Sequence, residues 1–140
     1  MGYQRHRNSV NGNRYDFVVI QEQSLNPVKN ERDFINGVKG VMALINANKF
    51  ILYATWGRND ESPDLATLGL TREEMTERLS IAYNNAGKEC GATVAEVGKA
   101  FLEYSKNNDR NSLYNPDNTH PSAIGSELAA KIIFNKMINQ

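Results

Sequence analysis

The sequence predicts an α/β fold in which helices cover a parallel β-sheet. Two observations indicate this fold class. Short apolar runs alternate along the chain with segments whose apolar residues recur at helical spacing. The runs are apolar at consecutive positions, as in strands buried on both faces, whereas half-exposed strands alternate apolar and polar residues. With 140 residues, 40% of them hydrophobic, the chain has the size of one compact domain with one core.

The domain is expected to span residues 15–140. Residues 1–14 are polar and contain Gly12 between two asparagines, so we expect a loop or a frayed leader there. Residues 17–20 (FVVI) are the first expected strand, apolar on both faces, and residues 21–27 are its exit loop.

The next segment predicts a helix over residues 31–47. Its apolar residues recur at helical spacing: Phe34, Ile35, Val38, Val41, Met42 and Ile45. Residues 50–54 form the second expected strand. The polar segment 56–70 contains two glycines and a proline, and it should be a long loop at the carboxyl end of that strand.

The third unit begins with a capping-box pattern. Thr71 and Glu74 have the spacing in which each side chain bonds the backbone amide of the other, and an apolar stripe continues from them to Gly87. Residues 93–97 are the third expected strand and residues 99–106 a short helix.

The chain should close with a helix. Pro121 suits a first helical position, and the apolar stripe after it reaches nearly to Gln140. Residues 109–119, which precede this helix, are expected to be irregular.

Composition argues against several classes of function. Sixteen basic and sixteen acidic residues cancel, and no run of Lys and Arg is long enough to attract nucleic acid or an anionic membrane. No apolar stretch approaches the roughly 20 residues of a membrane span, and the polar leader lacks the apolar core of a signal peptide. The compartment therefore stays open.

Neither a metal site nor a cofactor is expected. Cys90 is the only cysteine, so no disulfide can form within the chain, and a small core residue is a better interpretation of it than a catalytic thiol. The two histidines, His6 and His120, lie far apart and give no metal-ligand spacing.

Residues 117–121 (DNTHP) bring a carboxylate and an imidazole within three residues of each other. In a hydrolytic triad the carboxylate binds one ring nitrogen, and the other ring nitrogen takes a proton from the nucleophile. The alternative is a turn in which Asp117 accepts hydrogen bonds from local amides and His120 caps the following helix.

This stretch resembles the last conserved block of the SGNH (GDSL-type) ester hydrolases, which place Asp and His three apart before their final helix. The His-Pro-Ser continuation adds to the likeness. Asn118 stands where the family often has Gly, and Asn also tolerates a left-handed turn. The resemblance implies that His120 is a general base and then a general acid, and that Asp117 orients it.

A second likeness follows the first strand. Residues 18–24 (VVIQEQS) can be laid over the family's apolar strand running into Gly-x-Asn-Asp. Gln23 then falls on the oxyanion-hole Asn, a type of contact worth about 3 kcal/mol. Gln21 and Ser24 replace the Gly and the Asp, so both would line the substrate site. The alternative is a polar loop after a buried strand.

The letters Gly-x-Asn-Asp also occur at residues 57–60, but we reject an oxyanion site there because this segment follows the second strand. In the branch that the chain resembles, a Thr-Trp pair at that strand's end belongs to the pocket rim. Trp56 and Arg58 would then contact the acyl or alcohol part of a substrate. The alternative is a surface loop with one half-buried Trp.

The resemblance implies a flavodoxin-like three-layer α/β/α sandwich that is incomplete, with three strands of about five. The chain would supply strands 3, 4 and 5 of the order 2-1-3-4-5, so its first strand would keep an unpaired edge that invites homo-oligomers. The family's nucleophilic serine belongs to a Gly-Asp-Ser-like turn that residues 1–14 lack, and Ser9 is a poor substitute.

Three hypotheses follow. In the first, the parent protein hydrolyses a small-molecule acyl or acetyl ester, for which a carbohydrate-linked group suits this branch, and this chain alone is inactive. In the second, the chain is a non-catalytic module that binds a small molecule or a partner through the same loop edge. In the third, Ser24 is the nucleophile, which requires its hydroxyl within about 3 Å of the His120 ring. Family members are often exported.

Overall fold

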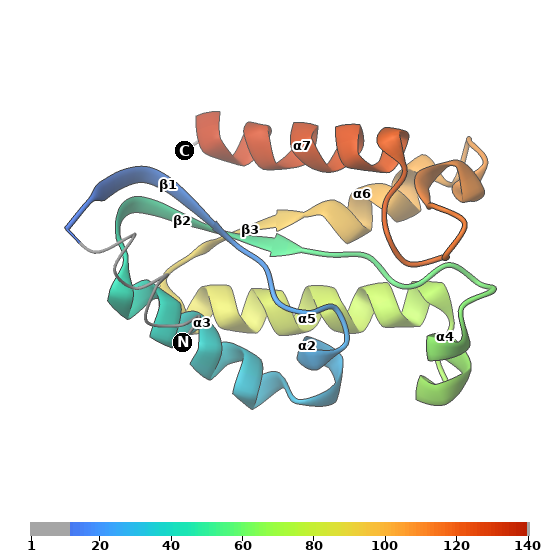
Figure 1. Ribbon diagram of the computed structural model, residues 1–140, viewed down its shortest axis with the longest axis horizontal. Helices are drawn as coiled ribbons and strands as arrows, with labels where there is room; N and C mark the ends of the chain where they lie inside the picture. The colour runs from blue at the N-terminus through green and yellow to red at the C-terminus, as the bar shows by residue number, and fades with distance from the viewer. Residues whose placement is uncertain (1–11, 140) are drawn as a thin grey trace.

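The computed structural model describes residues 12–139, which form a three-stranded parallel sheet with helices on both faces (Figure 1). The strands β1 (Arg14–Ile20), β2 (Asn46–Ala54) and β3 (Thr93–Glu96) lie side by side in chain order. Figure 1 shows α3 (Glu31–Leu44) and α5 (Arg72–Cys90) on one side of the sheet and α7 (Ala123–Ile138) on the other. The predicted three-layer α/β architecture is confirmed.

The larger part of the core lies between the sheet and the helices α3 and α5. Leu52 and Ala54 of β2 point into it, together with the Phe34 and Tyr83 rings, whose centroids are 4.6 Å apart. Because side chains alternate along a strand, Tyr53 faces the opposite side of the sheet. The central strand β2 is therefore covered on both faces, as its sequence predicts.

A second cluster lies under α7 and beside α6 (Val97–Tyr104). Trp56 stacks on Phe101 with ring centroids 4.3 Å apart and planes 9° apart, and Tyr114 meets Phe101 edge-on at 6.0 Å. These rings join the end of β2 to the segment before α7. The aromatic cluster thus lies at the same end of the sheet as the candidate site.

Strand β1 is covered on one face only, so the prediction that it is buried on both faces is wrong. Ile20 is 9% exposed, whereas Phe17 and Val19 are 40% and 39% exposed. Within residues 12–139, no strand pairs with the outer edge of β1. The prediction of an unpaired first-strand edge is confirmed for the described part of the chain.

The helix α5 starts as its sequence predicts but ends later. Thr71 and Glu74 form a complete capping box, and Gly91, with φ 71°, ends the helix after Cys90. The helix continues past Gly87, where a Cβ would lie 2.9 Å from both the Ala92 carbonyl oxygen and the Val94 side chain. Gly87 therefore allows the helix to approach β3 closely.

The last helix begins at Ala123, so the prediction that Pro121 occupies its first position is wrong. The Ser122 side chain caps the helix by accepting a hydrogen bond from the Gly125 amide at 3.1 Å. Pro121 instead pairs with Tyr114 in an isolated antiparallel bridge. A serine hydroxyl satisfies a free helical amide, which proline cannot do, and this sets the boundary.

Both expected loops contain short helices. Residues 21–27 run into α2 (Asn26–Lys29), and residues 56–70 contain α4 (Pro63–Leu68). The signals for α4 are present in the sequence. Ser62 caps the helix, Pro63 is its first residue, and Gly69 ends it with φ 67°. A 3₁₀ turn, η1 (Arg110–Leu113), lies in the segment expected to be irregular.

Some sequence-based expectations concern absences or residues outside the described range. The polar leader, with His6 and Ser9, lies mostly before residue 12. Among residues 12–139, no helix is long and apolar enough to cross a membrane, and no three His, Cys, Asp or Glu side chains form a metal-binding group. Cys90 is half-buried at the margin of the larger core, and burial raises the pKa of its thiol.

Candidate active site

A cleft of about 460 Å³ lies at the carboxyl end of the sheet, where ligands bind in open α/β folds. The exit of β1, the exit of β2 and the loop before α7 converge on it. Among the predicted site residues, only Asp117 does not line the cleft. The lining residues are Gln21, Glu22, Gln23, Ser24, Tyr53, Thr55, Trp56, Arg58, Thr119, His120 and Pro121.

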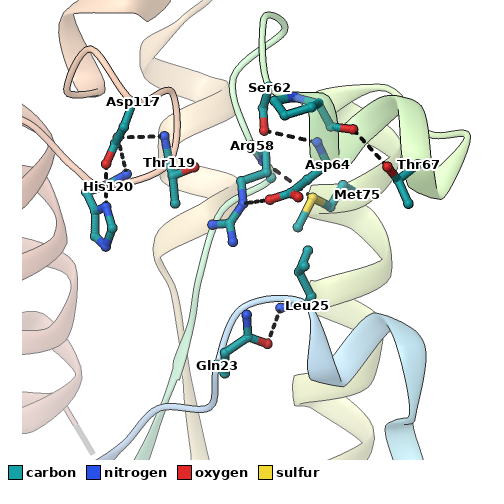
Figure 2. A network of polar contacts seen from close by, with 12 residues as sticks. Gln23, Leu25, Arg58, Ser62, Asp64, Thr67, Met75, Asp117, Thr119 and His120 are labelled. Carbon is teal, nitrogen blue, oxygen red and sulfur yellow. Dashed lines mark hydrogen bonds and ion pairs between the residues drawn. The ribbon is translucent and has the colours of Figure 1, made fainter.

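Asp117 and His120 are bonded to each other (Figure 2). Oδ2 of Asp117 lies 2.5 Å from Nδ1 of His120, and Oδ1 accepts hydrogen bonds from the backbone amides of Thr119 and His120 at 3.0 and 2.9 Å. The ring contact, followed by the two amides, lowers the pKa of Asp117 to about 2. The carboxylate is therefore ionised near neutral pH and remains an acceptor.

This arrangement fixes what the imidazole can do. With Nδ1 donating to a carboxylate, the neutral ring carries its proton on Nδ1 and leaves Nε2 free to accept one. The His120 side chain is 72% exposed, so Nε2 is within reach of a reactant in the cleft. Asp117 also forms the local turn, but His120 does not cap α7, because Ser122 does.

The loop that carries this pair is a tight reversal. The amide of Asn115 donates to the His120 carbonyl oxygen at 2.8 Å, and the amide of Asn118 donates to the Asn115 carbonyl oxygen at 3.0 Å. Asn118 has φ 59° and is the one non-glycine residue with positive φ in the described chain. Its short amide side chain tolerates this left-handed conformation better than most.

Gln23 presents its amide nitrogen to the cleft. Its carbonyl oxygen accepts hydrogen bonds from the Leu25 and Asn26 amides at 3.1 and 3.2 Å, which orients the side chain. Its two N–H groups form no hydrogen bond with any residue of the described range, and Figure 2 shows the nitrogen on the side away from Leu25. The amide is thus fixed at one end and available as a donor at the other.

Arg58 is held in a similar way. Its side chain is buried, and Nε donates to Oδ2 of Asp64 at 2.9 Å. The two terminal nitrogens have no hydrogen-bond partner among residues 12–139 and point away from Asp64 in Figure 2. Since Arg58 lines the cleft, these nitrogens offer a fixed pair of donors to a ligand.

Trp56 supports the loop rather than standing half-buried on a surface, so that alternative is wrong. The side chain is 6% exposed and stacks on Phe101. Its Nε1 donates to the Thr119 carbonyl oxygen at 3.1 Å. One indole therefore lines the cleft and also bonds the segment that carries His120.

The segment at residues 57–60, which matches Gly-x-Asn-Asp, does not offer its amide to the cleft. Asn59 is 3% exposed, and its side-chain nitrogen donates to Oδ1 of Asn111 at 3.0 Å and to Oδ1 of Asn118 at 3.1 Å. Both N–H groups are therefore used within the protein. Asn59 is not among the residues that line the cleft.

Tyr83 is a supporting residue that sequence reasoning missed. Its hydroxyl accepts a hydrogen bond from the Glu22 amide at 3.2 Å, and burial raises the pKa of Tyr83 to about 12. The contact orients the exit of β1, where Glu22 and Gln23 line the cleft. In the sequence, Tyr83 is one more apolar position in the α5 stripe, so no signal distinguishes it.

Among known proteins, the chain matches solved structures only. No protein-family model and no curated protein matches the chain. A candidate SGNH hydrolase from Slackia heliotrinireducens matches with a TM-score of 0.79 and 28% identity, over 96% of this chain. The chain is structurally similar to SGNH hydrolases. Axe2, an acetylxylan esterase from Geobacillus stearothermophilus, matches with a TM-score of 0.64 over 89% of this chain, and at 16% identity it shows the fold alone.

The SGNH-like chain spans only part of these proteins, 70% of the length of the first and 60% of the length of Axe2. A partial match agrees with the expected incomplete sandwich.

No described serine is hydrogen-bonded to His120 in the cleft. Ser24 lines the cleft, but within residues 12–139 no hydrogen bond joins it to the imidazole. Ser62 and Ser122 each cap a helix. The cleft therefore contains a bonded Asp–His pair and free amide and guanidinium donors, without a bonded nucleophile in the described residues.

Proposed function

We propose that this chain is the acid–base part of an SGNH-type ester hydrolase whose nucleophilic serine lies outside residues 12–139. The observation that carries the proposal is the 2.5 Å contact between Oδ2 of Asp117 and Nδ1 of His120, at a cleft that Gln23 also lines. A carboxylate on Nδ1 leaves Nε2 as the base, which is the arrangement that a serine nucleophile requires.

In the proposed reaction, Nε2 of His120 removes the serine proton as the oxygen attacks the ester carbonyl carbon. The carbonyl oxygen becomes an oxyanion, and the Gln23 amide donates a hydrogen bond to it. His120 then gives its proton to the leaving alcohol oxygen. Water next attacks the carbonyl carbon of the acyl-serine while Nε2 takes its proton, and His120 returns that proton to the serine oxygen as the acid leaves. Asp117, with a pKa of about 2, stays ionised and stabilises the imidazolium throughout.

The free edge of β1 suggests where the serine would come from. The cleft lies at the carboxyl ends of β1 and β2, and in a parallel sheet all carboxyl ends share one edge. A parallel strand added to the outer side of β1 would end beside this cleft. Such a strand would bring a serine at its carboxyl end toward His120.

The substrate class is proposed from the same cleft. Catalytic mutants of Axe2 replace a serine and also an aspartate and a histidine three positions apart, the spacing of Asp117 and His120. Axe2 is an acetylxylan esterase, so a short acyl group on a carbohydrate is our first candidate substrate. Arg58, Trp56, Gln21 and Ser24 would contact the sugar or the acyl group.

The test compares the longer parent protein, containing the upstream residues, with its His120→Ala variant. We expect hydrolysis of p-nitrophenyl acetate and of acetylated xylo-oligosaccharides by the parent, with kcat lower by a factor of about 10⁴ or more in the variant. His6→Ala is the matched control and should keep full activity. Equal rates for the parent and His120→Ala would remove His120 from the mechanism.

Two other outcomes would favour the remaining hypotheses. Hydrolysis by the 140-residue chain itself, abolished by Ser24→Ala, would make Ser24 the nucleophile. A parent protein that binds acetylated sugars in calorimetry without hydrolysing any ester would favour a non-catalytic binding module. We expect neither, because the Asp–His pair has the geometry of an acid–base catalyst and Ser24 is not bonded to it.

A further inference from the structure

The loop that carries Asp117 and His120 is tied to the segment that follows β2. The Tyr114 hydroxyl donates to the Gly57 carbonyl oxygen at 2.8 Å, and the Trp56 indole donates to the Thr119 carbonyl oxygen at 3.1 Å. Asn59, two residues after Gly57, bonds Asn118, which lies between Tyr114 and Thr119 along the loop. The segment after β2 therefore holds the loop at two points, since Tyr114 lies before the Asp117–His120 pair and Thr119 lies within it.

Asn59 forms two hydrogen bonds with Asn118, the residue after Asp117. Its backbone amide donates to the Asn118 carbonyl oxygen at 3.0 Å, and its side-chain nitrogen donates to Oδ1 of Asn118 at 3.1 Å. The second side-chain hydrogen bond goes to Oδ1 of Asn111 at 3.0 Å. Asn59 is 3% exposed, so water cannot readily replace it as a donor.

These two hydrogen bonds stabilise an unusual backbone conformation of Asn118. A φ of 59° is costly for a residue with a side chain, and such a conformation persists only where the surroundings hold it. This conformation turns the chain so that the amides of Thr119 and His120 both point at Oδ1 of Asp117. Oδ2 is then free for the His120 ring, at 2.5 Å.

We propose that Asn59 is a positioning residue for the Asp117–His120 pair. By binding the backbone and the side chain of Asn118, it holds the left-handed turn in which one carboxylate receives the two amides and the ring together. The catalytic meaning of this role rests on the proposed function, whereas the positioning is a property of the chain. In this proposal the Gly-x-Asn-Asp segment at residues 57–60 positions the Asp117–His120 pair and does not donate to the oxyanion.

The test measures the pair directly by NMR in the 140-residue chain. In the unaltered chain the Asp117 carboxyl should titrate with a pKa of about 2. In Asn59→Ala we expect this pKa to rise toward the ordinary value of 3.8, and the fraction of neutral His120 with its proton on Nδ1 to fall. A residue that only stabilised the fold would lower the unfolding temperature and leave both signals unchanged.

Asn111→Ala is the matched control, because it removes a partner of Asn59 and leaves the contact with Asn118 intact. We expect its Asp117 pKa to stay near 2. A folded Asn59→Ala variant with an unchanged Asp117 pKa and an unchanged His120 tautomer would overturn the proposal. An equal rise in both variants would also overturn it, because the effect would then not run through Asn118.

If Asn59→Ala does not fold, substitutions of Asn118 decide the question. Glycine adopts positive φ freely and alanine does not, so we expect a raised Asp117 pKa in Asn118→Ala and a smaller change in Asn118→Gly. Equal values in the two variants would refute the role of the turn. In the active parent protein, Asn59→Ala should lower kcat about tenfold or more, with little change in KM. An inactive parent protein would refute the proposed function. The NMR result would still test the positioning role of Asn59 independently.

Discussion

Replacing Gly57 with alanine should lower the free energy of unfolding by more than the addition of one methyl group usually does. A Cβ at residue 57 would lie 2.4 Å from the Arg72 carbonyl oxygen and 2.8 Å from Oγ1 of Thr76. The first of these atoms belongs to the backbone of α5, which cannot move aside as a flexible side chain can. The segment between Trp56 and Arg58 would therefore have to move away from the helix.

The magnitude follows from what that shift disturbs. Overpacking by one carbon costs about 1–3 kcal/mol, and a rigid backbone neighbour places Gly57→Ala at the upper end of the range. The shift also strains two buried hydrogen bonds, from the Gly57 amide to Thr76 at 2.9 Å and from the Tyr114 hydroxyl to the Gly57 carbonyl oxygen at 2.8 Å. Each contributes about 1 kcal/mol, and partial loss of both adds about 1 kcal/mol, so we expect a total loss of about 3–4 kcal/mol.

Urea unfolding followed by circular dichroism measures this loss. Gly40→Ala is the matched control, because Gly40 lies inside helix α3 with nothing within 4 Å of a Cβ. Alanine is favoured over glycine inside a helix, so the control should gain about 0.5–1 kcal/mol. A free energy of unfolding for Gly57→Ala within about 0.5 kcal/mol of the unaltered chain would refute the close packing described for this segment.

Three further predictions concern the site and the sheet edge. Because the folded pKa of Asp117 is lowered from 3.8 to about 2, its stabilising effect should be complete above about pH 4 and vanish as the pH falls through 2; acid titration of the unaltered chain against Asp117→Asn checks this as a difference between two unfolding curves. Trp56→Phe keeps the stacking but loses the hydrogen bond to Thr119, so it should cost about 1 kcal/mol in unfolding and lower kcat of the parent more than it raises KM. Val19→Lys charges the exposed face of β1 beside its unpaired edge, and sedimentation should show less self-association than in the unaltered chain; equal association would exclude this face of the strand as the contact.

Sequence patterns predicted those features whose hydrogen bonds join residues close together in the chain. The Thr71–Glu74 capping box forms because its hydrogen bonds join residues three apart, whatever packs around them. The apolar runs mark β2 and β3, and β3 is found where expected. The bounds of β2 were wrong: the helix expected over residues 31–47 ends at Leu44, and β2 begins at Asn46 and not at residue 50. Like the capping box, the Asp117–His120 pair could be proposed from the amino-acid sequence alone, since its hydrogen bonds close within one turn.

Features set by tertiary packing could not be predicted. Gly87 has the appearance of a helix end, but its lack of a side chain serves the contact with Ala92 and Val94. Phe17 and Val19 read as buried, although burial of that face of β1 would depend on a covering layer that residues 12–139 do not supply. For Gly87 the deciding feature is the close packing against β3, and for β1 it is a layer missing from residues 12–139.

The two amide side chains considered for the oxyanion show why a motif needs its partners before it can be assigned a role. Asn59 has the family's letters around it, yet both of its N–H groups bind Asn111 and Asn118. Gln23 departs from those letters, yet its carbonyl oxygen is bound while its N–H groups have no partner in residues 12–139. An oxyanion needs a donor that is oriented beforehand and not already used. Gln23 meets both conditions and Asn59 meets only the first, which is why we propose Gln23 as the oxyanion donor although its match in sequence is poorer.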